Sequence, residues 1–182
     1  MVELLRQVTH VFLGIAILAF SVSFGLEATA YALFALTIAY SLLLYASTMG
    51  WVKLLYIFIR KNELFPGSGA LYYVASLLFI ASYPHTTLPV FAAALLALAM
   101  GDGFSTLCGN LPIEKHKLFN GKSLEGSFGG LVVLFLAYAV AGYPLIVSVA
   151  LSLAYALVEL LSPIDDNITV PLTIAILAFY II

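Results

Sequence analysis

The sequence has very little charge and a single cysteine. Charged residues make up 9% of its 182 residues, against 64% hydrophobic residues and a mean hydropathy of +1.14. A soluble domain carries about a quarter charged residues, so this composition excludes an ordinary soluble protein. Cys108 alone excludes an internal disulfide, and no Cys/His cluster has the spacing of a zinc site. No cleavage site for a signal peptide follows the first apolar run, so we expect that run to remain in the protein.

Two long stretches, 64–101 and 126–158, contain no Asp, Glu, Lys or Arg. As a single helix, 64–101 would be about 57 Å long, nearly twice the thickness of a bilayer core. We therefore expect turns at Tyr83-Pro84-His85 and at Gly142-Tyr143-Pro144. The sequence predicts an all-α, polytopic membrane protein, a single domain over 1–182 with about seven transmembrane helices. Their expected positions are 8–24, 28–47, 68–83, 87–101, 127–142, 145–161 and 168–182.

The basic residues give an orientation for these spans. With seven spans and a cytoplasmic N-terminus, all seven Lys and Arg residues lie on the cytoplasmic side, as the positive-inside rule requires. Of the acidic residues, only Glu27 then lies on the other side. The segment 51–60 has an apolar body, two basic residues and aromatic anchors, which is typical of a helix lying flat at the interface. A cytoplasmic extension of the second helix is the alternative.

Polar residues concentrate between Gly101 and Gly126. This segment holds three of the seven basic residues and three of the nine acidic residues. Asp102 lies between two glycines, which predicts a sharp backbone bend that lets a ligand approach. Lysines and the first amides of the next span are suited to bind phosphate oxygens. A carboxylate, lysines and a helix N-terminus suit Mg²⁺-nucleotide phosphoryl transfer, so we expect a catalytic loop at about 101–126.

Three other polar positions are candidates for the same site. Arg6 and His10 share one helix face, although a snorkelling Arg and a packing His are the simpler explanation of this pair taken alone. Glu159 lies about one turn inside an apolar span, and ionisable residues there are costly and usually functional. Asp165-Asp166-Asn167 follows the helix-ending Ser162-Pro163, and a solvated turn is the simpler interpretation of it.

Taken in order along the chain, these motifs resemble the CTP-dependent lipid kinases. That family includes dolichol kinase, phytol kinase and yeast-type diacylglycerol kinase, in a superfamily with phosphatidate cytidylyltransferase. Its core signature is similar to Gly101-Asp102-Gly103, Gly109, Lys117 and Gly121-Lys122-Ser123-Leu124-Glu125-Gly126-Ser127. Further similarity lies in Arg6 with His10, in Gly67, Gly69 and Tyr72, and in Glu159 followed by Asp166-Asn167 and Pro171.

The resemblance implies transfer of the CTP γ-phosphate to a membrane alcohol, giving a lipid monophosphate and CDP. A polyprenol such as dolichol is the acceptor we expect, with Mg²⁺ or another divalent cation as cofactor. Asp102, Glu159 and Asp166 are the expected catalytic residues, and Asp102 and Asp166 the expected metal ligands. The residues expected to bind the nucleotide or its phosphates are Lys117, Lys122, Ser123, Glu125, Gly126, Ser127, Asn167, Arg6 and His10.

Two other functions remain open at this point. A cytidylyltransferase would attack the α-phosphate and make a CDP-lipid, using a similar Asp-Gly centre and Lys-Ser-Leu-Glu-Gly loop. A transporter would also contain intramembrane acids, but its site usually lies near the bilayer midplane, often between inverted repeats that this sequence lacks. We expect no nucleic-acid partner. The expected location is the cell membrane in a prokaryote or the endoplasmic reticulum in a eukaryote, with the catalytic loop cytoplasmic.

Overall fold

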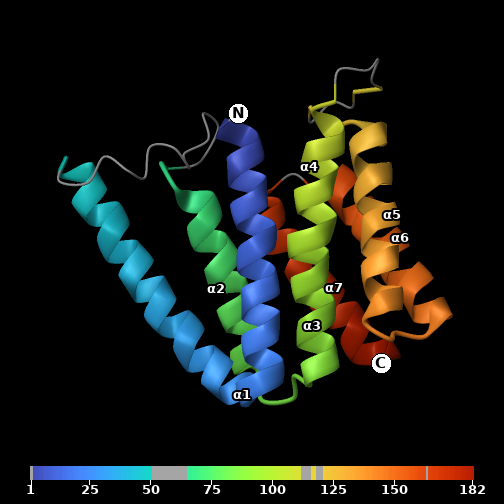
Figure 1. Ribbon diagram of the computed structural model, residues 1–182, viewed down its shortest axis with the longest axis horizontal. Coiled ribbons are helices and arrows are strands. Elements are labelled where there is room, and N and C mark those ends of the chain that lie inside the picture. Colours follow the sequence, from blue (N-terminus) through green and yellow to red (C-terminus); the bar gives the residue numbers. More distant parts are fainter. Residues whose placement is uncertain (1, 51–64, 112–115, 118–120, 163) are drawn as a thin grey trace.

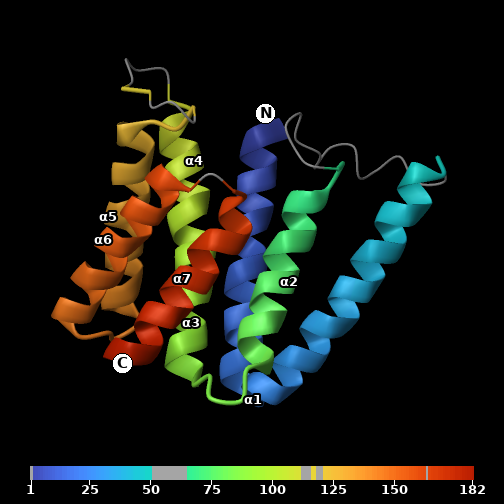
Figure 2. The same cartoon turned by 180° about the vertical axis from the view of Figure 1, so that it is seen from behind.

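The structure, a computed structural model, describes residues 2–50, 65–111, 116–117, 121–162 and 164–182. Within these ranges the regular elements are helices, and Lys117 and Ser123 form an isolated bridge. The expectation of an all-α fold is confirmed, and Figures 1 and 2 show the helices assembled into one bundle. In chain order they are α1 (Val2–Thr48), α2 (Ser68–Ser82), α3 (Leu88–Leu96), η2 (Ala97–Asp102), α4 (Gly103–Gly109), α5 (Leu124–Val140), α6 (Leu145–Leu161) and α7 (Asp166–Ile181).

Helix α1 consists of two legs joined at Gly25. This residue has φ 82° and ψ 171°, a backbone conformation that glycine adopts far more readily than other residues. The legs on either side correspond to the helices predicted at 8–24 and 28–47. Figures 1 and 2 show the second leg running back at an angle to the first, so that it leans away from the bundle.

Both predicted turns are present. Helix α2 ends at Ser82 and α3 begins at Leu88, while α5 ends at Val140 and α6 begins at Leu145. Gly142 has φ 85°, which explains a glycine at the second turn. The long uncharged runs are therefore divided at the two Pro-containing positions that the sequence indicated.

The expected end of the fourth helix was wrong. Helices α3, η2 and α4 form one continuous apolar helix from Leu88 to Gly109, so no loop begins at Gly101. Gly103 has helical φ and ψ, −56° and −48°, and does not bend the chain. A Cβ on Gly101 would lie 2.7 Å from the Tyr155 ring, and one on Gly103 would lie 2.8 Å from Val11. These two glycines therefore allow close helix packing. In the sequence, a pair of glycines of this kind cannot be distinguished from a turn.

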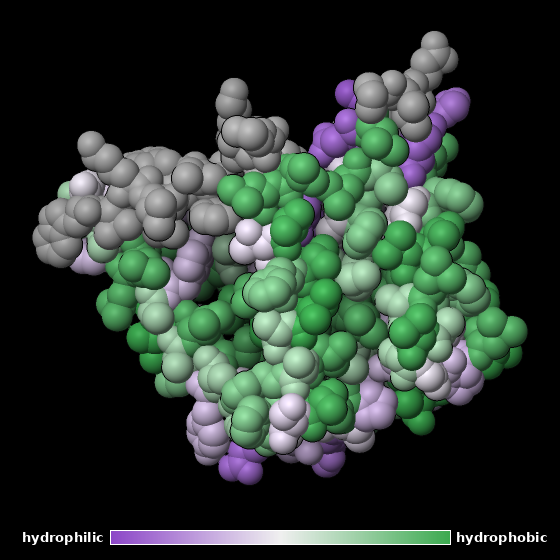
Figure 3. Space-filling model, in the orientation of Figure 1, coloured by the Kyte–Doolittle hydropathy of each residue, from purple (hydrophilic) through white to green (hydrophobic). Residues whose placement is uncertain are grey.

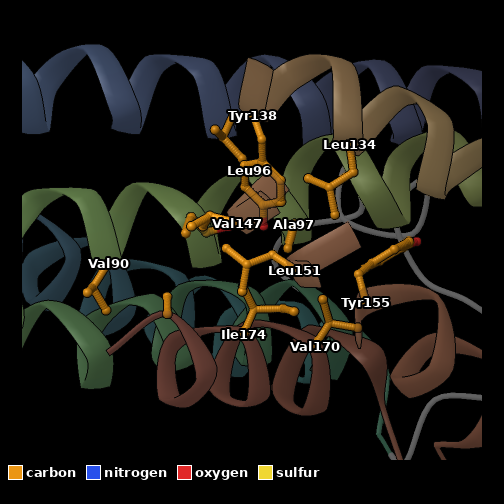
Figure 4. Packing of buried hydrophobic residues seen from close by; sticks show 12 residues of the cluster. Val90, Leu96, Ala97, Leu134, Tyr138, Val147, Leu151, Tyr155, Val170 and Ile174 are labelled. Carbon is orange, nitrogen blue, oxygen red and sulfur yellow. Dashed lines mark hydrogen bonds between the residues drawn. The ribbon is translucent and has the colours of Figure 1, made fainter. Parts of the chain in front are cut away.

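The main apolar core lies where α3, α5, α6 and α7 meet. Figure 4 shows Leu96, Leu134, Tyr138, Leu151 and Ile174 converging between these helices. The Tyr138 hydroxyl donates to the carbonyl of Ala93 at 2.9 Å, so this buried ring carries no unsatisfied polar atom. A packed core at this position fixes the helices that carry the polar end of the bundle.

Among the described residues, two helices are long and apolar enough to cross a membrane, Leu4–Thr48 and Leu88–Gly109. The other four apolar helices are shorter, so the number of seven spans remains a prediction. Hydrophobic side chains cover most of the face in Figure 3, and polar residues gather toward its two ends. The predicted interfacial segment 51–60 lies outside the described residues.

Candidate active site

A cavity of about 350 Å³ lies at the end of the bundle that holds the N-terminus and the connection from α4 to α5 (Figure 1). Its lining comes from α1, from η2 and α4, from Lys117, Gly121 and Lys122 before α5, and from α5, α6 and α7. The lining residues are Arg6, Asp102, Ser105, Thr106, Gly109, Asn110, Lys117, Gly121, Lys122, Ser123, Gly126, Glu159 and Asp166. Within the described part of the chain, three carboxylates and three cationic side chains therefore face one space.

Most of the site residues expected from the sequence line this cavity: Arg6, Asp102, Lys117, Lys122, Ser123, Gly126, Glu159 and Asp166. His10, Glu125, Ser127 and Asn167 do not line it. The three Lys and Arg residues within the described ranges all line it, and the expectation that all seven basic residues share one side of the membrane stays a prediction. The remaining four, including Lys115, lie outside the described residues.

Asp102 occupies the last position of the π-helical turn η2. Its residue is only 4% exposed, and its carboxylate accepts no hydrogen bond from the described residues. The Ser105 hydroxyl donates to its main-chain carbonyl at 3.1 Å, and His10 Nε2 lies 3.8 Å from its Oδ2. Turns of this kind occur mostly as single insertions into α-helices and often at functional sites. The structure thus holds a buried carboxylate, with His10 beside it, against the cavity.

Lys122 is held by carboxylates. Its Nζ donates to Asp166 Oδ1 at 2.6 Å and to Oδ2 at 2.7 Å, and lies 3.6 Å from Glu159 Oε1. It also donates to the main-chain carbonyl of Glu159. The sequence predicted that Lys122 binds phosphate. In the structure its ammonium neutralises Glu159 and Asp166, and so links the end of α6 to the start of α7.

Glu159 is buried among donors at the end of α6. Its residue is 5% exposed, and Ser127 donates a hydrogen bond to its Oε2. Ser127 is itself buried, and its hydroxyl oxygen also lies 3.2 Å from the carbonyl oxygen of Ser123. Ser127 donates to Glu159 and does not line the cavity, so its hydroxyl orients the Glu159 carboxylate. Its contact with phosphate stays a prediction.

Asp166 lies in the first turn of α7 and lines the cavity. Burial and the negative charge of Asp102 raise the pKa of Asp166 to about 7, while the Lys122 ammonium opposes the shift. Repulsion from the nearby Asp102 carboxylate disfavours the charged form of Asp166. The side of the cavity formed by Asp102 and Asp166 therefore favours the binding of a further cation.

The described residues contain no group of three or more His, Cys, Asp or Glu side chains arranged to hold a metal ion. Mg²⁺, however, typically binds through one or two carboxylates together with substrate phosphates and water. The Lys122 ammonium lies between the Asp166 and Glu159 carboxylates, so in this structure the lysine occupies the cation position between the two acids. These two carboxylates fit a Mg²⁺ ion brought by a nucleotide.

Glu125, in the first turn of α5, binds His116 of the segment that precedes this helix. Its carboxylate accepts from the His116 main-chain amide at 3.1 Å and from His116 Nδ1 at 2.6 Å. The hydrogen bond from the His116 side chain lowers the pKa of Glu125. Gly121, between these two residues, has φ 81° and requires glycine for this conformation. The geometry therefore favours a role for Glu125 in shaping the connection, and its predicted phosphate contact is untested.

Asn167 is buried in the first turn of α7. Its main-chain amide and its side-chain Nδ2 both donate to Asp165 Oδ1, at 3.0 and 2.9 Å, so Asp165 caps the helix. The sequence interpreted 165–167 as either a solvated turn or a part of the site. The structure divides it: Asp165 caps the helix, Asp166 lines the cavity and Asn167 supports the turn.

Ser105, Thr106 and Asn110 line the cavity and were not expected from the sequence. They were missed because 101–126 was interpreted as a loop. On one helix, positions 102, 105, 106, 109 and 110 follow the i, i+3, i+4, i+7 spacing of a single face. That spacing was the signal that would have identified them.

The comparisons with known proteins give one informative relative. No protein-family model matches the chain, and no solved structure matches it. Over 128 residues the chain is 32% identical to a curated protein from Arabidopsis thaliana. That relative is a farnesol kinase, described as chloroplastic. The match covers 61% of this chain and 42% of the relative, so the chain spans less than half of the relative's length. The similarity supports the resemblance to lipid kinases.

Proposed function

We propose that this protein is a CTP-dependent kinase that phosphorylates a prenyl alcohol in the membrane. The observation that carries the proposal is the cavity in which Asp102, Glu159 and Asp166 face Lys117, Lys122 and Arg6 at one end of an apolar bundle. Phosphoryl transfer requires positioning and charge neutralisation more than covalent catalysis by the protein. Similarity to a farnesol kinase supports the same reaction class.

The chemical step follows from the groups in the cavity. The hydroxyl oxygen of the lipid forms a bond to the γ-phosphorus of CTP, and the bond from that phosphorus to the β–γ bridging oxygen breaks. The hydroxyl proton passes to Asp102, a carboxylate that is buried and lines the cavity. Lys117 and Arg6 neutralise the charge of the phosphates, and the products are a lipid monophosphate and CDP.

In place of the Asp102–Asp166 pair expected from the sequence, Asp166 and Glu159 are the residues that would hold Mg²⁺, because both face the cation position that Lys122 occupies. When bound, the ion would neutralise the phosphate charge that develops during transfer. Lys122 would then be available to bind phosphate oxygens, as the sequence predicted. Ser127 keeps the Glu159 carboxylate in place, and Ser123 caps α5 by accepting from the Gly126 amide at 3.2 Å.

The position of the cavity suits a membrane-bound acceptor. It lies at one end of the bundle, and the long apolar helices extend from it in one direction (Figures 1 and 2). We infer a polytopic chain of seven spans with this end at the cytoplasmic surface. A prenyl chain would remain in the bilayer while its hydroxyl reaches Asp102. A site at one end of the bundle does not favour a transporter, whose site usually lies near the midplane.

The acceptor is tested by comparing turnover of the purified protein on farnesol, a dolichol-type polyprenol and diacylglycerol in one detergent system. Phosphorylation of either prenyl alcohol well above diacylglycerol is the expected result. The sequence predicts the polyprenol, whereas the farnesol kinase relative favours the shorter alcohol. Faster phosphorylation of diacylglycerol would contradict the prenyl assignment while leaving phosphoryl transfer intact.

A further inference from the structure

His10 reaches from α1 into the π-helical turn that carries Asp102. Its Nε2 lies 2.9 Å from the carbonyl of Leu98, which is inside η2. A carbonyl only accepts hydrogen bonds, so Nε2 carries the proton that bridges the two helices. The same nitrogen lies 3.8 Å from Asp102 Oδ2. One ring nitrogen therefore contacts both the main chain of the turn and the side chain that the turn presents.

The His10 ring is fixed from its other side by Tyr73 of α2. The two rings meet edge to face with centroids 4.5 Å apart, and the Tyr73 hydroxyl donates to the His10 carbonyl at 3.4 Å. Edge-to-face contacts of this kind favour one ring orientation. Helices α1 and α2 together hold the imidazole in place before any ligand binds.

Helix α1 also lies unusually close to the π-helical turn on both sides of His10. A Cβ on Gly14 would lie 2.3 Å from Ala99 Cβ, and a Cβ on Gly103 would lie 2.8 Å from Val11. Glycines at these two positions let α1 approach η2, and His10 contacts the Leu98 carbonyl between them. His10 does not line the cavity, and the nucleotide contact that the sequence predicted for it stays a prediction.

We propose that His10 is a positioning residue that maintains the π-helical turn and thereby aims Asp102 into the cavity. The physical reason is the helix register. A π-helical turn contains one residue more than an α-helical turn, so its loss would rotate Asp102 about the helix axis by about 100° relative to the preceding residues. The hydrogen bond from His10 to Leu98 stabilises the wider turn. This assignment rests on the proposed function, because it takes Asp102 as the proton acceptor.

Two substitutions at one position separate this role from a nucleotide contact. His10→Ala removes the donor to Leu98, whereas His10→Gln keeps an N–H donor at a similar reach. We expect His10→Ala to lower kcat roughly 10- to 100-fold, as losses of orienting groups do, with the KM for CTP unchanged. His10→Gln should recover most of that loss. Thr9→Ala, beside it on α1, is the matched control, since Thr9 is exposed and donates only to Leu5 of its own helix.

Hydrogen exchange of the amides between residues 98 and 103 gives a readout that needs no turnover. Exchange should quicken in His10→Ala and stay near the original rate in His10→Gln. A higher KM for CTP with unchanged kcat, or His10→Gln no better than His10→Ala, would overturn the proposal, as would unchanged exchange in His10→Ala. If the original protein transferred no phosphate, the proposed function would fail, and the exchange rates would still decide the contact between His10 and the turn.

Discussion

Lys122 and Asp166 form an ion pair in which Nζ lies 2.6 Å from Oδ1 and 2.7 Å from Oδ2. The same ammonium lies 3.6 Å from Glu159 Oε1, so the pair also joins α6 to α7. The two acids come from the helix ends that frame the cavity, and the lysine comes from the connection to α5. A side chain expected to bind phosphate thus occupies the cation position between two acids.

Replacing Lys122 by Ala should have opposite effects on metal binding and on turnover. Without the ammonium, Asp166 and Glu159 lose their competing cation, so Mn²⁺ (used as a spectroscopic probe for Mg²⁺) should bind the empty protein more tightly. Turnover with CTP should fall, because the lysine is no longer there to bind phosphate. Titration of Mn²⁺ by electron paramagnetic resonance and a kinase assay measure the two effects.

Lys117→Ala is the comparison for that variant. Lys117 lines the same cavity but is exposed, and it lies on the bridge to Ser123. Its loss should raise the KM for CTP without tightening Mn²⁺ binding. Equal Mn²⁺ affinities in the original protein and Lys122→Ala would show that the lysine does not occupy a metal position.

Asp102→Asn should reduce kcat by about 10²-fold or more while leaving the melting temperature unchanged, because it removes a group that acts in the transition state. The control is Asp165→Asn, the same chemical change beside the site. Asp165 does not line the cavity, and Asn caps helices as well as Asp does, so activity should persist. Near-normal turnover of Asp102→Asn would contradict the catalytic role and show that Asp102 is structural.

Gly101→Ala should destabilise the fold by about 1–3 kcal/mol, because its Cβ would lie 2.7 Å from the Tyr155 ring in a packed core. Gly109→Ala, at the end of the same helix, would make only ordinary contacts, the nearest at 3.5 Å, and should be neutral or slightly stabilising. Thermal unfolding of both variants in detergent measures the difference. Equal melting temperatures would mean that Gly101 serves flexibility and not packing.

The orientation in the membrane is tested with single cysteines at opposite ends of the bundle. In a Cys108→Ser background, Lys117→Cys should react with an impermeant thiol reagent only after the membrane is opened. His85→Cys, in the turn between α2 and α3, should react from the outside (Figure 1). The reverse pattern, or labelling of both from one side, would contradict the inferred topology.

The sequence predicted the helical segments because apolar runs and turn residues are local signals. Pro84 and Gly142 marked both turns, and the break at Gly25 falls between the first two predicted helices. The helix through Gly101 and Gly103 was missed because a glycine against a neighbouring helix and a glycine in a bend look alike in one sequence. The partner that distinguishes them, Tyr155, lies far away in the chain.

The residues of the site were largely predictable, but their contacts were not. Arg6, Asp102, Lys122, Glu159 and Asp166 were expected to meet, and they line one cavity. That Lys122 would pair with Asp166, and that Ser127 would donate to Glu159, depends on the packing of α5 against α6 and of α6 against α7. Such contacts between distant segments leave no pattern in local spacing.

The measurement that tests the central claim most directly is the fate of isotopic label from CTP. The purified protein is incubated with a prenyl alcohol, Mg²⁺ and CTP that carries label at either the γ- or the α-phosphate. Phosphoryl transfer predicts labelled lipid from γ-labelled CTP alone, with Asp102→Asn as the inactive control. Label entering the lipid from α-labelled CTP alone would contradict the account and establish cytidylyl transfer.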